Sequence, residues 1–370
     1  CSDGADVHFS VIFKILGMLL MLFSSAMLAP LVLAVVAEEI TVMGFLWALT
    51  ITFASGLLMW LPVKNVQREL RIRDGFLITS LFWTVLGLFG ALPFALSGCL
   101  DLTPTEAVFE SISGLTTTGA TVIVGLDDLP RSILLYRQLL QWLGGIGIIV
   151  VAVAVLPMLG IGGMQLYKAE TPGPSKDTKL RPRITETAKS LAAVYVALTI
   201  TCALAYYAVG MSAFDAVAHA FSTVAIGGFS THDASIGYFE STAILIVCSV
   251  FMSISAVNFG LHFMAWRRRT AGVYIKDSET RFFFSALATV VLITCVYLVF
   301  SGTLDPVNGI VHGLFQAISI TTTTGFATQN FAAWPSFLPV MLLMFSFMGG
   351  CVGSTGGGMK AMRVMLIYKQ

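Results

Sequence analysis

The stretch from Ile318 to Gln329 decides the fold, and it reads I-S-I-T-T-T-T-G-F-A-T-Q. It is a run of small hydroxyl residues that ends at a glycine and follows a short apolar segment. Similar runs occur earlier, as S-G-L-T-T-T-G-A-T at 113–121 and F-S-T-V-A-I-G-G-F-S-T at 221–231. The glycines that align are Gly119, Gly228 and Gly325. Their two intervals of about a hundred residues indicate an internal repeat.

Glycine in such a run suits a backbone that turns its carbonyl groups toward one axis. It adopts positive φ without strain and leaves room where chains crowd together. Several such segments side by side would form a ring of carbonyl oxygens, which can replace the hydration shell of a monovalent cation. The repeat therefore predicts a cation filter.

The composition of the chain is that of an integral membrane protein. Only 11% of its 370 residues are charged, whereas soluble domains carry roughly 25%. The mean hydropathy is +0.87. The net charge of +1 says nothing about partners, so the distribution of the charges has to be considered instead.

Eight segments are apolar and long enough to cross a bilayer, which takes about 20 residues. They are Phe9–Val36, Thr41–Leu61, Phe76–Leu96, Leu134–Leu159, Leu191–Val209, Ala243–Trp266, Phe282–Phe300 and the stretch from Phe337. Three further apolar segments are too short to cross, and each precedes one of the glycine runs. They are Leu100–Leu115, Ala213–Val224 and Val307–Ile320.

Basic residues indicate that the short segments enter the membrane and return. Eighteen of the 21 Lys and Arg residues fall in three loops (64–73, 168–189 and 267–281) and the C-terminal stretch. Cytoplasmic loops are enriched in Lys and Arg. The three loops share one side only if the short segments do not cross. This topology predicts filters near the outer face and a cytoplasmic N-terminus.

Each short segment begins like a helix. Thr103-Pro104-Thr105-Glu106 has a capping threonine, a proline at the first helical position and a glutamate at the third. Ser212 to Asp215 repeats the pattern, and Asp305-Pro306 begins the third segment. The negative C-terminal end of each helix would then point toward a glycine run and favour a cation there. Non-helical backbone at this depth is tolerated only where it lines a pore or is buried in protein.

The last apolar stretch, Phe337 to Tyr368, is broken by a dense run of glycines. Glycine is a poor helix former, so we expect a loop inside the membrane, on the cytoplasmic side of the third filter segment. Such a loop could close the pore, and the charge of Lys360 would repel or gate cations. The candidate gating residues are Gly349, Gly350, Gly353, Ser354, Thr355, Gly356, Gly357, Gly358 and Lys360.

With these motifs the chain resembles the Trk/Ktr/HKT superfamily of potassium transporters, most of all its bacterial TrkH/TrkG membrane subunits. The matching stretches are T-T-T-G-A at 116–120, Q-W-L-G-G-I-G at 141–147, S-T-V-A-I-G-G-F-S at 222–230, T-T-T-T-G-F at 321–326 and 349–360. The resemblance implies an all-α, potassium-channel-like fold of about eight transmembrane and three re-entrant pore helices, in repeated span–pore helix–span units. The candidate filter residues that would hold K+ are Thr117, Thr118, Gly119, Ile226, Gly227, Gly228, Thr323, Thr324 and Gly325.

The resemblance also predicts the organisation of the chain. Two leading spans (1–63) precede three pore units (64–163, 164–266 and 267–370), whereas the family has four units. We expect the chain to be a fragment whose fourth unit follows; a functional three-unit protein is the alternative. The family implies a homodimer in the lipid of the bacterial inner membrane with a cytoplasmic nucleotide-binding regulatory subunit of the TrkA type. No cofactor and no nucleic acid are expected.

Several other polar residues have simpler explanations than ion binding. Glu110, His219 and Gln316 each lie nine residues before a filter glycine. We expect them to form hydrogen bonds behind the filter, and ion attraction is the alternative. Arg137 and Gln141 are one helical turn apart in a span, where we expect a structural tie to a neighbouring pore helix. The residues expected to be merely solvated on the outer face are Asp127, Asp128, His232, Asp233 and Glu240.

Two classes of function are compatible with a membrane protein of this kind. A cation permease explains the three repeated filters, and glycine at all three positions favours K+ by resemblance, with a less selective Na+/K+ permease as the alternative. An intramembrane enzyme would need a nucleophile–base pair or a metal cluster at membrane depth. The five histidines show no such arrangement, so no enzyme is expected. Channel-like flux and symport with H+ or Na+ both remain open.

Overall fold

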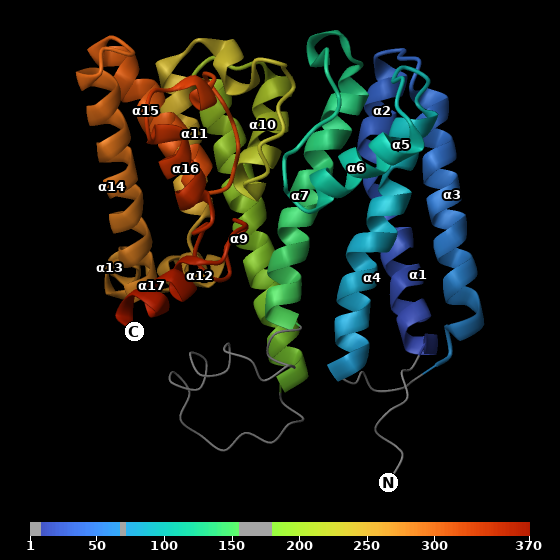
Figure 1. Cartoon of the computed structure of the whole chain (residues 1–370). Coiled ribbons are helices and arrows are strands. Elements are labelled where there is room, and N and C mark those ends of the chain that lie inside the picture. The colour runs from blue at the N-terminus through green and yellow to red at the C-terminus, as the bar shows by residue number, and fades with distance from the viewer. Residues whose placement is uncertain (1–8, 67–71, 155–179) are drawn as a thin grey trace.

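The structure is a computed structural model that describes residues 9–66, 72–154 and 180–370. In these ranges the regular elements are all helical (Figure 1). The first half contains α1 (Phe9–Ala26), α2 (Leu28–Val36), α3 (Val42–Trp60), η1 (Leu61–Val63), α4 (Ile72–Gly90), α5 (Leu92–Leu96), α6 (Pro104–Leu115), η2 (Leu126–Asp128) and α7 (Arg131–Ala154). The second half contains α9 (Leu180–Ala208), α10 (Ala213–Ala225), η5 (Ser235–Phe239), α11 (Thr242–Ser255), α12 (Phe259–Arg268), α13 (Gly272–Lys276), α14 (Ser278–Phe300), α15 (Pro306–Thr321), η6 (Phe331–Ala333), α16 (Leu338–Ser346) and α17 (Ala361–Lys369).

Most of the expected membrane segments are present as long apolar helices. Among the described residues, five helical stretches are long and apolar enough to cross a bilayer, namely Phe9–Val36, Val42–Val63, Leu77–Leu96, Thr187–Ala208 and Ser278–Phe300. The end of the expected span Leu134–Leu159 lies outside the described residues, as do Arg68, Arg71, Lys168, Lys176 and Lys179 of the basic loops.

The expected straight span over Ala243–Trp266 is instead two helices, α11 and α12, which meet at an angle of 94°. The side chain of Asn258 caps α12 by accepting a hydrogen bond from the Gly260 N–H at 2.7 Å. Backbone groups at the break are paired with the glycine-rich loop of the last segment. The sequence of this segment is apolar on both sides of the break, so its hydropathy alone does not reveal the bend.

The three short segments form the helices α6, α10 and α15, with the predicted N-terminal caps. Thr103 and Glu106 form a reciprocal capping box at the start of α6. The side chains of Ser212 and Asp305 accept hydrogen bonds from backbone N–H groups in the first turns of α10 and α15. In Figure 1 these helices lie in the upper half of the view, whereas α12, α13 and α17 lie below them.

The two halves pack on each other through α7 and α10. Trp142 and Ile146 of α7 pack against the core formed by α9–α17, and Phe214 of α10 packs against the core formed by α1–α7. Close approach requires small residues here. A side chain on Gly144 would collide with the carbonyl oxygen of Leu115, and one on Gly145 would lie 3.2 Å from Ala225. These glycines allow the neighbouring elements to pack closely.

Candidate functional site

Three irregular segments follow the short helices, and their backbones have the same local conformation. We call residues 116–121, 225–230 and 322–327 the first, second and third segments. In each, a residue with φ of 55°, 55° or 68° is followed two positions later by a glycine with φ of 77°, 83° or 88°. The positive-φ residues two positions before these glycines are Thr117, Ile226 and Thr323. The residues between, Thr118, Gly227 and Thr324, each donate their backbone N–H over 2.9 Å to the carbonyl of the serine five positions earlier.

The three segments lie against one another in chain order. A Cβ on Gly119 would collide with the carbonyl oxygen of Gly227, and a Cβ on Gly228 would collide with that of Thr324. Glycine is therefore required at Gly119 and Gly228 both by the positive φ and by the neighbouring carbonyl group. The nine predicted filter residues are thus brought together, with carbonyl groups close to the glycines of adjacent segments.

Buried polar side chains hold the segments from behind. The equivalent residues Glu110, His219 and Gln316 are all fully buried. Glu110 accepts from the Thr121 hydroxyl at 3.0 Å and from the Val122 N–H at 3.1 Å. Because buried polar groups are costly unless they are paired, these bonds account for a carboxylate in this place. The expected role in hydrogen bonding agrees with these contacts.

The other two equivalent residues bond to the segment of their own unit. His219 Nδ1 lies 2.9 Å from the carbonyl oxygen of Asp215. Because a carbonyl oxygen can only accept, Nδ1 is the donor of this bond. In the neutral imidazole Nε2 then accepts, here from the Ser230 hydroxyl at 2.9 Å. Gln316 makes longer contacts, 3.4 Å to the Phe326 carbonyl and 3.5 Å from the Thr328 N–H.

Arg137 and Gln141 connect α7 to the segments, as the expected structural tie requires. The Arg137 Nε donates to Glu110 Oε1 over 2.8 Å, and the two side chains are at most 1% exposed. One turn further along α7, the Gln141 amide nitrogen donates to the Gly227 carbonyl at 2.7 Å, and its oxygen accepts from the Phe229 N–H at 3.1 Å. Gln141 thus fixes both sides of the Gly228 turn.

The glycine-rich loop between α16 and α17 touches the end of α10 and the third segment. The Gly357 N–H donates to the Thr323 hydroxyl at 2.8 Å. The Thr355 hydroxyl donates at 2.9 Å to the carbonyl of Val224, near the end of α10. The predicted helix break is therefore present, and it brings the candidate gating residues next to the candidate filter.

The loop is held by residues that the sequence did not reveal as functional. The Cys351 N–H donates to the Ala256 carbonyl at 2.8 Å, and the Phe259 N–H donates to the Gly353 carbonyl at 3.0 Å. Glu279, which is 4% exposed, accepts through Oε1 from the backbone N–H groups of Val352 at 2.8 Å and Met362 at 3.1 Å. A charged residue at the start of an apolar run is the signal that could have indicated this anchor.

The candidate gating residue Lys360 lies at the end of this loop. Its backbone has a positive φ of 74°. Its amino group donates to the carbonyl of Gly356, within the loop itself. The ammonium group thus binds back to the loop, an arrangement that stabilises the conformation of the loop.

The expectation that the outer-face residues are merely solvated is wrong for three of them. His232 Nδ1 lies 2.5 Å from Asp127 Oδ1. The Asp233 carboxylate accepts from the backbone N–H groups of Gly125 at 3.1 Å and Leu126 at 2.9 Å. These bonds join parts of the chain about a hundred residues apart, which single-sequence reasoning could not pair. Asp128 and Glu240 are exposed, as expected.

The contact between Asp127 and His232 predicts a loss of stability in acid. The hydrogen bond from His232 holds the pKa of the Asp127 carboxyl below its ordinary value of 3.8. A carboxyl whose pKa is lowered on folding stabilises the folded state at pH values above its ordinary pKa. This stabilisation is lost as the pH falls through the pKa of the group in the folded protein. Between about pH 6 and about pH 3, the melting temperature of Asp127→Asn should therefore fall less than that of the wild type. Asp128→Asn is the control, and an identical curve for both variants would contradict the assignment.

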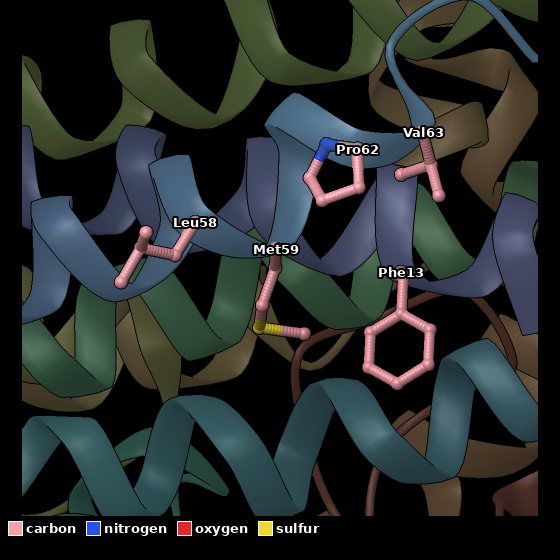
Figure 2. Close-up of a pocket in the computed structure, with 5 residues that line it drawn as sticks. All are labelled: Phe13, Leu58, Met59, Pro62 and Val63. Atoms are coloured by element: carbon pink, nitrogen blue, oxygen red, sulfur yellow. The ribbon is translucent and has the colours of Figure 1, made fainter.

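A cavity of about 360 Å³ lies at a different place, between α1 and the end of α3 with η1. Figure 2 shows the side chains that line it, all of them apolar, namely Phe13, Leu58, Met59, Pro62 and Val63. They offer no oxygen ligand for a cation. This cavity is therefore not part of the candidate filter.

Comparison with known proteins adds to this geometry. Residues 42–370 match the family model TrkH, described as a cation transport protein. The chain is 57% identical over 360 residues to the Trk system potassium uptake protein TrkH of Halomonas elongata, covering 97% of this chain and 75% of that protein. It is 52% identical to the protein of the same name from Escherichia coli K12, covering 98% of this chain and 76% of that protein.

A solved structure supports the same relationship. The crystal structure of the potassium transporter TrkH from Vibrio parahaemolyticus matches with a TM-score of 0.89 and 50% sequence identity. The match covers 98% of this chain and 75% of that chain. The resemblance of the glycine runs to this superfamily is confirmed, and the membrane transporter, not the intramembrane enzyme, is the correct class of function. The chain belongs to the TrkH family of cation transport proteins.

Proposed function

We propose that the chain takes up K+ across the bacterial inner membrane as the ion-translocating subunit of a Trk-type system. The observation that carries this proposal is the repeated backbone of the three segments, each with its glycine turned to positive φ. Two of these glycines lie against a carbonyl oxygen of the next segment. Carbonyl oxygens of this kind substitute for the hydration shell of K+. The nine predicted filter residues, Thr117 to Gly119, Ile226 to Gly228 and Thr323 to Gly325, would form the ion sites.

We further propose that residues 349–360 gate the pore beneath this filter. The contacts of Thr355 with the end of α10 and of Gly357 with Thr323 in the third segment support this role. Movement of the loop away from these contacts would open a path for the ion. The pore units 64–163, 164–266 and 267–370, preceded by the spans of 1–63, remain our proposed division of the chain.

The proposed assembly is supported by the same family membership. The relatives are named as parts of a Trk system, and we propose a homodimer in membrane lipid with a cytoplasmic nucleotide-binding partner of the TrkA type. The N-terminus would be cytoplasmic, because the basic loops belong on that side. Symport with H+ or Na+ and channel-like flux are both compatible with this proposal.

The test is uptake of K+ by a transport-deficient bacterium on limiting potassium. The chain is expressed alone and with a related fourth pore unit added after Gln370, each together with a TrkA-type partner. Restored growth and K+ uptake by either form would support the proposal, and the comparison would show whether three units suffice. If neither form restores uptake although both reach the membrane, K+ is not the transported ion.

A further inference from the structure

The buried ion pair between α6 and α7 does more than connect two helices. Arg137 uses all three nitrogens of its guanidinium group. Besides the Nε bond to Glu110, Nη2 donates to the Thr121 hydroxyl at 2.9 Å and Nη1 donates to the Ser230 carbonyl at 3.1 Å. Its Cζ also lies 4.3 Å from the centre of the Phe229 ring.

The two acceptors occupy equivalent positions in the repeat. Thr121 comes two residues after Gly119, and Ser230 comes two residues after Gly228. A single planar group is thus bonded to the last residue of the first segment and to the last residue of the second. A guanidinium group holds its donors in a rigid fork, so it fixes the distance and the register between these two segments.

The end of the third segment is held differently, by η5 (Ser235–Phe239), which follows the second segment. There, the Gly237 N–H donates to the Ala327 carbonyl, and the Ala327 N–H donates to the Ser235 hydroxyl, each over 3.2 Å. Both bonds are neutral. Charge-assisted hydrogen bonds are roughly twice as strong as neutral ones, so the first contact is the stiffer of the two.

We propose that Arg137, charge-balanced by Glu110, is a positioning residue that sets the preference for K+ by fixing the first segment against the second. It acts through the carbonyl groups of the segments and does not touch the ion. The preference is sensitive to such a residue because functional groups must be held within about 0.5 Å of their productive geometry. This inference rests on the proposed function as a K+ filter.

The informative substitution is Arg137→Lys. Removing the positive charge altogether would leave the buried Glu110 carboxylate without a balancing charge, which is strongly destabilising. A folding defect could then not be distinguished from a change in the filter. Lysine keeps the charge beside Glu110 but lacks the fork, so it cannot hold Thr121 and Ser230 in the same way. Arg131→Lys is the matched control, because Arg131 lies at the start of the same helix with its guanidinium over the ring of Phe214.

The experiment measures cation flux into liposomes in K+ and in Na+, using the form of the protein that supports uptake, together with its melting temperature. We expect Arg137→Lys to lower the K+-over-Na+ ratio about tenfold, the size of one lost charge-assisted bond, while Arg131→Lys leaves the ratio unchanged. Thr121→Val removes one acceptor and should lower the ratio less. Combined with Arg137→Lys it should add little, because the two groups form one contact.

The outcomes separate this inference from the proposal beneath it. An Arg137→Lys protein with the wild-type ratio would overturn the inference, even if its melting temperature fell, because that result describes a purely structural residue. Full additivity of Thr121→Val and Arg137→Lys would also overturn it. A wild-type protein without any preference for K+ would refute the filter itself, before any variant is compared.

Discussion

Replacement of Gly228 by alanine should abolish K+ uptake. The residue has a φ of 83°, a conformation that costs an L-residue roughly 1–2 kcal/mol. The larger effect comes from space, because the new Cβ would collide with the Thr324 carbonyl oxygen. Either that carbonyl rotates away from the axis or the second and third segments separate, and both changes remove ligands from the ion.

The chain provides a matched control for the conformational cost of a positive φ alone. Gly98 also has a positive φ, 70°, but nothing lies within 4 Å of a Cβ built on it. Gly98→Ala therefore carries the conformational cost without the collision, and it should retain most of the uptake. Initial rates of K+ uptake, normalised to the amount of protein in the membrane, distinguish the two. Normal uptake by Gly228→Ala would mean that the second segment does not line the ion path.

The second large effect is expected at Glu279, where alanine should release the glycine-rich loop. One oxygen, Oε1, accepts the N–H groups of both Val352, within the loop, and Met362, in the first turn of α17. Hydrogen bonds to a charged group contribute about 1.5–3 kcal/mol each. Loss of both should raise the population of the displaced loop by at least about tenfold. We expect cation flux through liposomes to rise in the absence of any regulatory partner.

Two variants at the same helix end make this test specific. Glu279→Gln keeps a side-chain oxygen as acceptor, so its flux should stay closer to that of the wild type. Asp277→Asn removes a charge two residues away and keeps the cap on the Thr280 N–H, so no change is expected. Flux through Glu279→Ala equal to that of the wild type would show that the loop is held closed by other contacts.

The sequence was sufficient for those features that depend on local patterns. Caps at Thr103, Ser212 and Asp305 are local, as is the positive φ at each repeated glycine. The glycine spacing indicated the repeat because it is visible along the chain. By contrast, the bend before Phe259 and the anchoring by Glu279 depend on the loop at 349–360, which lies far away in the sequence.

Side-chain contacts between different pore units were the other feature that the sequence could not predict. Arg137 was expected to tie α7 to a pore helix, and it does so, but its bond to Ser230 crosses 93 residues. The contact of His232 with Asp127 spans 105 residues. Each of these side chains, taken alone, is also typical of a solvated surface or of a packed helix, so a single sequence cannot choose its partner.

The break between α11 and α12 has a consequence for biosynthesis. The Ala256 carbonyl and the Phe259 N–H are satisfied by Cys351 and Gly353, which the ribosome adds about 95 residues later. Until then the nascent chain carries polar backbone groups that hydrocarbon cannot satisfy, at several kcal/mol each. The second pore unit therefore cannot mature when it leaves the insertion machinery. It must wait for residues 349–360 to be synthesised, so folding of the second unit depends on a later part of the chain.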